Sequence, residues 1–460
     1  MIVMKFGGSS VQDAAAINSV AGIVAARAGR KPVVVVSAMA RVTDALLDVA
    51  QAARDRRFDE LSAATSRLRD RHLTTARELL GHLSESSPEI IEREIQAQFA
   101  ELENMTRSVS TLGELTPRSQ DAIVSFGERL SSVIVAAAFR ARGIPSELVD
   151  SRRFIITDDH FTRAAPDMEQ TASRTRDALV PVINSGFVPV AQGFIGSTAD
   201  GVTTTIGRGG SDYTAALIGA ALGAEAIEIW TDVDGLMTAD PRVVANARRI
   251  RVISFSEASE LSYFGAKVLH PSTVLPAVEK GIPVHIYNTQ NPTCEGTLIV
   301  ATPPPSRNVI KSIAFKRGVT IVNVTSTRML AAFGFLRTIF EVFERHQTSV
   351  DVVTTSEVSV SMTLENIERL AAIKSDLGGI GEVTIEPDKA IVCVVGDNLK
   401  STPGVASRLF RAIASTNVNM ISQGASEINL TFVIDESDVD RVVGSLHDEF
   451  FAEVDPEVFA

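Results

Sequence analysis

Short apolar segments that alternate with helical patterns constrain the fold of this chain more than any other feature. Residues 2–6 (Ile-Val-Met-Lys-Phe) and 32–37 (Pro-Val-Val-Val-Val-Ser) are mostly apolar on both faces, and helical spacing over residues 11–27 separates them. Such runs are typical of strands in a parallel sheet that helices cover on both sides. The sequence therefore predicts a three-layer αβα fold, in which a mostly parallel sheet lies between two layers of helices. Further strand patterns with helices between them lie at residues 147–149, 188–191, 227–230 and 284–287.

Composition excludes several classes of protein. The chain has 460 residues, enough for two or three domains, and its net charge of -12 argues against nucleic acid or an anionic membrane as the main partner. Its two cysteines, Cys294 and Cys393, suit a reducing compartment, and its histidines lack metal-ligand spacing. The few residues before Lys5 are too short for a signal sequence, and no apolar run reaches membrane-spanning length. We therefore expect a cytoplasmic protein without a membrane partner, a nucleic-acid partner or a metal site of its own.

The C-terminal third of the chain contains an internal repeat. Three consecutive prolines at 303–305 indicate a linker. Beyond them, residues 334–360 align without gaps on residues 404–430, a constant offset of 70 (404 against 334). Each copy has a glycine before an amphipathic helix, a polar turn and two strand patterns. Two tandem copies of a small α/β module indicate a regulatory or assembly unit, although a purely structural duplication remains open.

Glycine-rich turns lie where strands meet helices. Residues 5–10 (Lys-Phe-Gly-Gly-Ser-Ser) follow the first strand, and residues 207–212 (Gly-Arg-Gly-Gly-Ser-Asp) follow a hairpin that turns at Asp200-Gly201. Glycines let a backbone approach a ligand, and the first turn of a helix binds anions through its N–H groups. Neither turn has P-loop or dinucleotide-binding spacing, and each alone could be an ordinary turn. Together with residues 264–267 (Phe-Gly-Ala-Lys) they predict a phosphate site with Lys5 and Lys267 as cations, although Lys267 alone could be a solvated lysine.

These motifs resemble those of aspartate kinases, which have the amino acid kinase fold. The repeat resembles the paired ACT domains that follow this kinase, and the long helical segment before Pro117 is similar to the longer bacterial and plant forms, so the resemblance covers the whole chain. It implies a catalytic domain over 1–300, a Pro-rich linker over 301–307 and two interleaved, ferredoxin-like ACT domains over 308–460. The motifs are residues 5–10, 126–129 (Phe-Gly-Glu-Arg), 207–212, 230–235 (Trp-Thr-Asp-Val-Asp-Gly), 240–242 (Asp-Pro-Arg) and 264–271.

The resemblance implies phosphoryl transfer from MgATP to the β-carboxylate of L-aspartate, the first step of lysine, threonine and methionine biosynthesis. A carboxylate with a pKa of about 3.9 is already ionised at neutral pH, so no general base is needed. The implied catalytic residues are Lys5, Asp212 and Lys267. The implied aspartate-binding residues are Ser37, Thr43, Glu128 for the α-ammonium, Arg208 for the α-carboxylate, and Asp212. The implied nucleotide-binding residues are Lys5, Gly7, Gly8, Ser9, Gly209, Gly210, Thr231, Asp232, Met237, Arg242, Lys267 and Val268, with Mg²⁺ mainly on phosphate oxygens.

Three positions depart from the family pattern. Arg41 stands where the family usually has glycine, and Asp44 where it has asparagine. If that glycine used positive φ, the loop that carries Thr43 must be reshaped. Met237 replaces a tyrosine that often packs near the adenine.

The first ACT module resembles the effector pocket of lysine-sensitive aspartate kinases. The resemblance implies L-lysine as an allosteric inhibitor, with Asp351 binding an ammonium group of the ligand and backbone amides near Gly334 binding its carboxylate. It also implies a homodimer or homotetramer formed through the ACT domains. The same residues could instead form only an ACT–ACT interface. The implied pocket residues are Met329, Gly334, Phe335, Leu336, Ser349, Val350, Asp351, Ser356, Glu357 and Val358.

Two other classes of protein fit the sequence less well. A non-catalytic amino-acid sensor with an inactive kinase domain would have no reason to keep every charged site residue. A dinucleotide-dependent dehydrogenase would need a Gly-x-Gly-x-x-Gly turn after a strand, which the chain lacks. Glutamate, acetylglutamate and uridylate kinases remain alternatives within the same fold.

Overall fold

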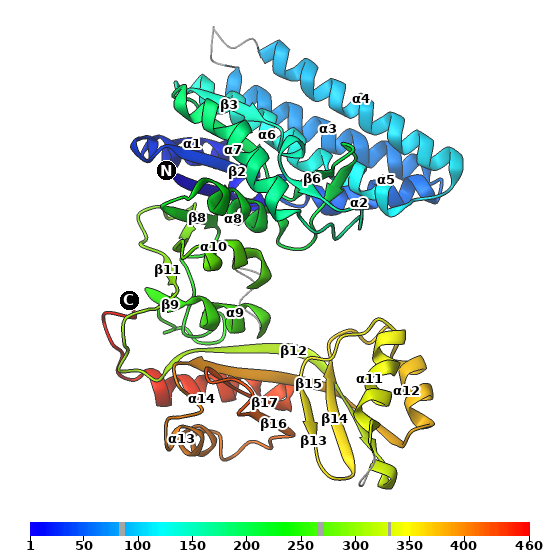
Figure 1. The fold of residues 1–460 in the computed structure, drawn as a ribbon, viewed down its shortest axis with the longest axis vertical. Coiled ribbons are helices and arrows are strands. Elements are labelled where there is room, and N and C mark those ends of the chain that lie inside the picture. The colour runs from blue at the N-terminus through cyan, green and yellow to red at the C-terminus, as the bar shows by residue number, and fades with distance from the viewer. Residues whose placement is uncertain (82–87, 265–270, 330–332) are drawn as a thin grey trace. The chain divides into compact units, whose positions relative to one another are not determined.

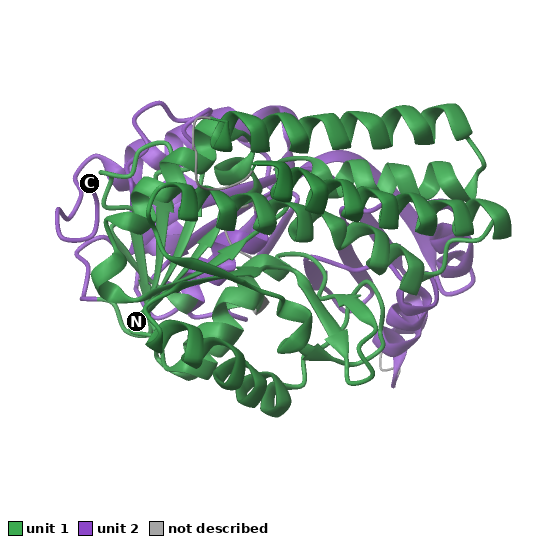
Figure 2. Ribbon diagram, turned by 90° about the horizontal axis from the view of Figure 1, so that it is seen from above, with its two compact units in different colours: residues 1–236, 251–255, 268–303 green, residues 237–250, 256–267, 304–460 purple. Residues whose placement is uncertain are grey.

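The computed structural model describes residues 1–81, 88–264, 271–329 and 333–460 (Figure 1). The chain divides into two compact units, coloured separately in Figure 2. Unit 1 comprises residues 1–236, 251–255 and 268–303, and unit 2 comprises residues 237–250, 256–267 and 304–460.

Unit 1 is organised around an eight-stranded sheet with the strand order β3-β5-β2-β1-β8-β10-β11-β9. The central strand β1 is buried along its whole length and pairs in parallel with β2 and β8. β10 and β11 pair in the antiparallel sense. The mostly parallel sheet predicted from the apolar runs is confirmed. The strands are β1 (Ile2–Phe6), β2 (Pro32–Val36), β3 (Ser146–Val149), β5 (Val188–Gln192), β8 (Ala226–Thr231), β9 (Val252–Ser254), β10 (Val284–Asn288) and β11 (Thr297–Val300).

Helices pack on both faces of this sheet, which confirms the three-layer prediction. α6 contacts β2, β3 and β5 and packs with α1, whereas α7 and α8 pack together and contact β1, β3, β5 and β8. The long helices α3 and α4 lie side by side and contact α6 (Figure 1). The helices of unit 1 include α1 (Ala14–Ala25), α2 (Val42–Arg54), α3 (Phe58–Leu80), α4 (Pro88–Leu112), α5 (Pro117–Val124), α6 (Phe126–Ala141), α7 (Met168–Asn184), α8 (Gly210–Leu222) and α10 (Leu275–Glu279).

The apolar stretch that forms α5 and α6 lies in the core. In the described part of the chain, residues 117–141 are long and apolar enough to cross a membrane by composition, but 89% of their most apolar window is buried. Burial of this kind is expected for the central helix of a core. A small sheet beside it contains β4 (Ile156–Thr157), β6 (Ile195–Thr198) and β7 (Thr203–Thr205), and β6 and β7 form the predicted hairpin.

Unit 2 contains a six-stranded antiparallel sheet with the order β13-β14-β12-β15-β17-β16. The two longest strands, β12 and β15, pair along most of their length. The first part of β12 lies against the half of β15 that pairs with β17, and its second part pairs with β14. Strands from the two copies of the repeat are therefore joined in one sheet through β12 and β15. The strands are β12 (Ile310–Thr325), β13 (Val353–Thr355), β14 (Ser359–Leu364), β15 (Glu382–Gly396), β16 (Met420–Gln423) and β17 (Asn429–Asp435).

The internal repeat is visible in the helices of unit 2. Gly334 and Gly404 precede α11 and α13 with φ of 77° and 84°, a left-handed conformation that glycine adopts without strain. The same local signal therefore starts the equivalent helix of both modules. The helices are α9 (Phe255–Phe264), most of which belongs to unit 2, α11 (Phe335–Arg345), α12 (Leu370–Gly378), α13 (Val405–Ala412) and α14 (Val439–Phe451).

Candidate functional site

An open cavity of about 520 Å³ in unit 1 brings most of the predicted charged residues together. Its walls come from β1, the loop after β2, the helices α5 and α6, and the turn before α8. In an open parallel sheet, ligands bind where strands end and helices begin, which is the position of this cavity. The predicted site residues that line it are Lys5, Gly8, Ser37, Thr43, Glu128, Arg208, Gly209, Gly210 and Asp212.

Lys5 and Asp212 form an ion pair in the wall of this cavity. The Lys5 Nζ lies 2.7 Å from the Asp212 Oδ1, and both side chains are 11% exposed. Lys5 is held by its place in the central strand β1, and Asp212 lies in the first turn of α8, after Gly209 with φ of 72°. The pair therefore places one oriented ammonium group at the end of a strand, next to the N-terminus of a helix. Such a group attracts a polyanion.

Close packing explains two of the glycines. A Cβ on Gly8 would lie 2.9 Å from the carbonyl oxygen of Ala38, and a Cβ on Gly210 would lie 2.7 Å from the ring of Phe194. Real Cβ atoms do not approach so closely, so both positions require glycine for packing alone. The glycines therefore maintain the shape of the cavity, whatever ligand it binds.

The backbone amides of the two turns are not all available to a ligand. The Gly7 amide donates to a carbonyl of β8, and the Gly210 amide donates to the Gly207 carbonyl, each at 3.0 Å. The amides of Gly8, Ser9 and Gly209 are therefore better candidates for phosphate donors than those of Gly7 and Gly210.

Glu128 presents a buried carboxyl group to the cavity. It lies in the first turn of α6 and is 3% exposed. Its Oε1 accepts a hydrogen bond from the Ala38 amide at 3.1 Å, and its Oε2 is buried without a hydrogen-bond partner among the described residues. Burial raises the pKa of Glu128 to about 8. An unpaired acceptor in this position suits a cationic ligand group, which would restore the charged form.

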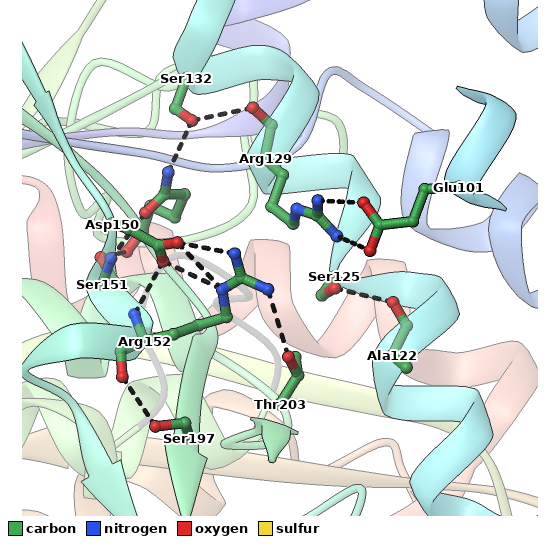
Figure 3. Close-up of polar contacts among 11 residues, drawn as sticks. Glu101, Ala122, Ser125, Arg129, Ser132, Asp150, Ser151, Arg152, Ser197 and Thr203 are labelled. Atoms are coloured by element: carbon green, nitrogen blue, oxygen red, sulfur yellow. Dashed lines mark hydrogen bonds and ion pairs between the residues drawn. The ribbon is translucent and has the colours of Figure 1, made fainter. Parts of the chain in front are cut away.

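Arg129 follows Glu128 in the same motif but has a structural contact. Figure 3 shows its guanidinium against the carboxylate of Glu101 on α4, with hydrogen bonds of 2.7 and 3.3 Å, and it also lies 4.2 Å from the centroid of the Phe126 ring. It does not line the cavity. One motif therefore contributes a cavity residue and a residue that ties α6 to α4.

Arg41 keeps the backbone conformation that a glycine would adopt. Its φ is 64° and its ψ is 6°, and it precedes α2, which carries Thr43 and Asp44 into the wall of the cavity. A reshaped loop was the expectation if the family glycine used positive φ. Instead the arginine itself adopts the left-handed conformation, at a cost of about 1 kcal/mol.

Asp121 is a cavity residue that the sequence did not reveal. It is buried on α5, and its carboxylate accepts hydrogen bonds from the Thr162 amide (2.9 Å), the Thr205 amide (2.9 Å) and the Thr205 hydroxyl (2.8 Å). Burial raises its pKa, and these hydrogen bonds oppose the shift. Asp121 thus ties two wall segments to α5, and no local sequence signal marks a residue whose partners are so distant.

The predicted nucleoside-side residues lie elsewhere in the chain. Thr231 is the last residue of β8, and its hydroxyl donates a hydrogen bond of 3.1 Å to the carboxylate of Asp232, the next residue. Arg242 is 87% exposed at its side chain and pairs with Asp240 at 2.6 Å. Met237 and Arg242 belong to unit 2. Lys267 and Val268 lie outside the described residues.

The predicted effector residues cluster around α11 and the sheet of unit 2. Met329, Phe335 and Val350 pack against one hydrophobic core. The Asp351 side chain is 5% exposed, with its Oδ1 hydrogen-bonded to the Tyr263 hydroxyl at 3.0 Å and its Oδ2 buried without a partner among the described residues. Sequence reasoning missed Tyr263 because its partner is 88 residues away. The other predicted pocket residues are Gly334 before α11, Leu336 on α11, Ser349 before Asp351, and the turn residues Ser356, Glu357 and Val358.

Comparisons with known proteins agree with this geometry. A model of the amino acid kinase family matches residues 1–288, and a model of the ACT domain matches residues 392–450. The chain is 38% identical to lysine-sensitive aspartokinase 3 of Escherichia coli over 98% of this chain and 99% of the relative. It is 37% identical to chloroplastic aspartokinase 1 of Arabidopsis thaliana over 98% of this chain and 80% of that protein. The crystal structure of E. coli aspartokinase III in complex with aspartate and ADP matches with a TM-score of 0.84 at 37% identity, covering 98% of this chain and 100% of that one.

Proposed function

Because the chain belongs to the aspartokinases of the amino acid kinase family, we propose specific roles for the residues of its cavity. The protein is an ATP-dependent kinase that acts on aspartate. The observation that carries the assignment of roles is one cavity with two features: the Lys5–Asp212 ion pair and the Glu128 Oε2, which has no hydrogen-bond partner among the described residues.

Aspartate binding is assigned to the Glu128 side of the cavity. The α-ammonium of aspartate would bind the buried Glu128 carboxylate, and the α-carboxylate would bind the guanidinium of Arg208, an exposed residue, as a bidentate pair. Ser37 and Thr43 line the same cavity and suit hydrogen bonds to the substrate. These contacts leave the β-carboxylate, already ionised at neutral pH, as the nucleophile.

Phosphoryl transfer is assigned to the lysine side of the cavity. Lys5, oriented by Asp212, would neutralise charge that spreads over the transferred phosphoryl group, together with Lys267. The amides of Gly8, Ser9 and Gly209 would contact phosphate oxygens. We assign Thr231, Asp232, Met237, Arg242 and Val268 to the nucleoside side.

Magnesium would be bound mainly by the nucleotide. Among the described residues no group of three or more His, Cys, Asp or Glu side chains could hold a metal ion. Asp212 already pairs with Lys5, and Asp121 already accepts three hydrogen bonds. These two carboxylates therefore have little capacity left to coordinate Mg²⁺. Mg²⁺ prefers to keep phosphate and water ligands, and when bound it neutralises charge on the phosphates.

We propose L-lysine as an allosteric inhibitor that binds at Asp351 in the first ACT module. A crystal structure of E. coli aspartokinase III in complex with lysine and aspartate matches this chain with a TM-score of 0.84, which supports the assignment. The buried Asp351 Oδ2, which no described residue hydrogen-bonds, suits an ammonium group. We further propose domain boundaries at 1–300, 301–307 and 308–460, a homodimer or homotetramer formed through the ACT domains, and a cytoplasmic location.

A hydroxamate assay tests the catalytic proposal. Hydroxylamine traps an acyl phosphate, so wild-type protein with ATP and Mg²⁺ should form hydroxamate with aspartate and much less with glutamate or acetylglutamate. Glu128→Gln should raise the KM for aspartate strongly, whereas Glu101→Gln, a matched change outside the cavity, should not. Equal KM values in the two variants would contradict the role of Glu128. A complete lack of ATP-dependent hydroxamate would favour a non-catalytic sensor.

A further inference from the structure

One side of α9 carries three polar residues at a spacing of three. Two of them contact the six-stranded sheet of unit 2, and the third contacts Asp351, just before β13. The Lys311 Nζ on β12 lies 3.0 Å from the Glu257 Oε1. Glu260 Oε2 accepts a hydrogen bond of 2.7 Å from the side-chain Nδ2 of Asn429 on β17. The Tyr263 hydroxyl donates to Asp351 Oδ1 at 3.0 Å. Residues three apart lie on one face of a helix, so this face of α9 contacts the six-stranded sheet of unit 2 and the segment before β13.

The two ends of α9 are attached with different strength. Glu257 and Lys311 are 3% and 2% exposed, and breaking a buried ion pair by removing one partner is strongly destabilising. Tyr263, at the other end, is 46% exposed and is held by a hydrogen bond to one carboxylate. The N-terminal end of the helix is therefore the fixed one, and its C-terminal end is the end that a local change can shift.

The carboxylate that holds Tyr263 is also the one proposed to bind the effector. Lys316 Nζ lies 3.5 Å from Asp351 Oδ1 and 5.2 Å from the centroid of the Tyr263 ring, and it also pairs with Glu365 at 2.8 Å. Within the described part of the chain, Asp351 Oδ2 has no hydrogen-bond partner, and a ligand ammonium bound there would add a second cation beside Lys316 and draw negative charge away from Oδ1. Both effects weaken the Tyr263 hydrogen bond.

We propose that Tyr263 is a positioning residue that couples occupancy of Asp351 by a cationic amino acid to the position of α9. The inference rests on the proposed function, because it takes Asp351 as the effector contact. Along the chain, α9 immediately precedes the segment with Lys267, the predicted second phosphate cation. A shift at the C-terminal end of α9 would therefore change the kinase reaction without any contact between Tyr263 and a substrate.

The test compares wild type, Tyr263→Phe and a matched control, Tyr287→Phe, in the full-length protein. The Tyr287 hydroxyl lies 3.2 Å from His285 Nδ1 in unit 1, so the control removes a hydrogen-bonded tyrosine hydroxyl that is not attached to Asp351. For each protein, lysine binding is measured by calorimetry. The KM for aspartate and the kcat are measured without lysine and with saturating lysine.

We expect Tyr263→Phe to bind lysine within about threefold of wild type. Its coupling, the ratio of kcat/KM without and with saturating lysine, should fall by about fivefold or more, since typical coupling factors are about 5 to 150. Tyr287→Phe should keep the wild-type coupling. Glu260→Ala, which releases the middle of α9 without touching Asp351, should also lower the coupling with lysine binding intact.

The outcomes separate this inference from the proposed function. If lysine inhibits wild type, Tyr263→Phe and Glu260→Ala to the same extent, lysine regulation stands and the role of Tyr263 is refuted. If Tyr263→Phe no longer binds lysine, Tyr263 is a ligand contact and the positioning role is likewise refuted. If lysine neither binds nor inhibits wild type, the effector proposal fails first, and the inference fails with it.

Discussion

The buried carboxyl group of Glu128 should make aspartate binding strongly pH-dependent. With its pKa raised to about 8, the group is mostly protonated in the free enzyme at pH 7. An ammonium ligand needs the carboxylate, so binding must first remove that proton. The apparent affinity is then weakened by a factor of about 100 at pH 6, about 10 at pH 7 and about 2 at pH 8. The KM for aspartate should therefore fall about 50-fold between pH 6 and pH 8.

Two measurements test this reasoning. Calorimetric titration of aspartate in buffers of different ionisation enthalpy should detect release of about 0.9 proton per aspartate at pH 7. The steep fall of KM should disappear in Glu128→Gln and persist in Glu101→Gln. Binding without proton release, or an unchanged pH profile in Glu128→Gln, would refute the pairing of Glu128 with the α-ammonium.

The same pKa shift has a consequence for the free enzyme. A carboxyl group whose folded pKa is raised binds more protons in the folded state than in the unfolded state. Its contribution to stability is therefore complete below about pH 4.5 and is lost as the pH rises to about 8. The loss is roughly 5 kcal/mol, and Glu128→Gln should remove this part of the pH dependence.

Four further outcomes are expected. Lys5→Met should lower kcat by about 100-fold or more, because the lysine neutralises developing charge, and a near-normal kcat would exclude it from the mechanism. Gly210→Ala should destabilise by about 1–3 kcal/mol through overpacking, whereas Gly22→Ala, on an exposed helix face with nothing within 4 Å, should stabilise by about 0.5–1 kcal/mol in thermal unfolding. Burial lowers the pKa of His72 to about 4, so stability should decline as the pH falls from about 6.5 to 4, and His72→Leu should abolish this decline in acid titrations. Asp351→Ala should keep kcat but relieve lysine inhibition, and retained inhibition in a dose–response assay would refute the effector assignment.

The internal repeat shows how much a local pattern can predict. The glycines at 334 and 404 stand at the same point of each copy, and both adopt the left-handed conformation before a helix. The continuous apolar runs predicted strands buried on both faces, and β1 and β2 are buried along their whole length. These features follow from periodicity and backbone sterics, which act over a few residues and are readable in the chain.

The properties of the site depended on contacts between distant segments. Asp121 is hydrogen-bonded to Thr162 and Thr205, which are 41 and 84 positions further along the chain. Tyr263 is hydrogen-bonded to Asp351, which is 88 positions away. The pKa of Glu128 is set by burial in a cavity whose walls come from several separate parts of unit 1. The sequence by itself thus determined the strands, the turns, the repeated module and the identity of the charged groups. Only the tertiary structure decided which of these groups are buried, paired or left without a partner, because desolvation and long-range hydrogen bonds arise after the chain has packed.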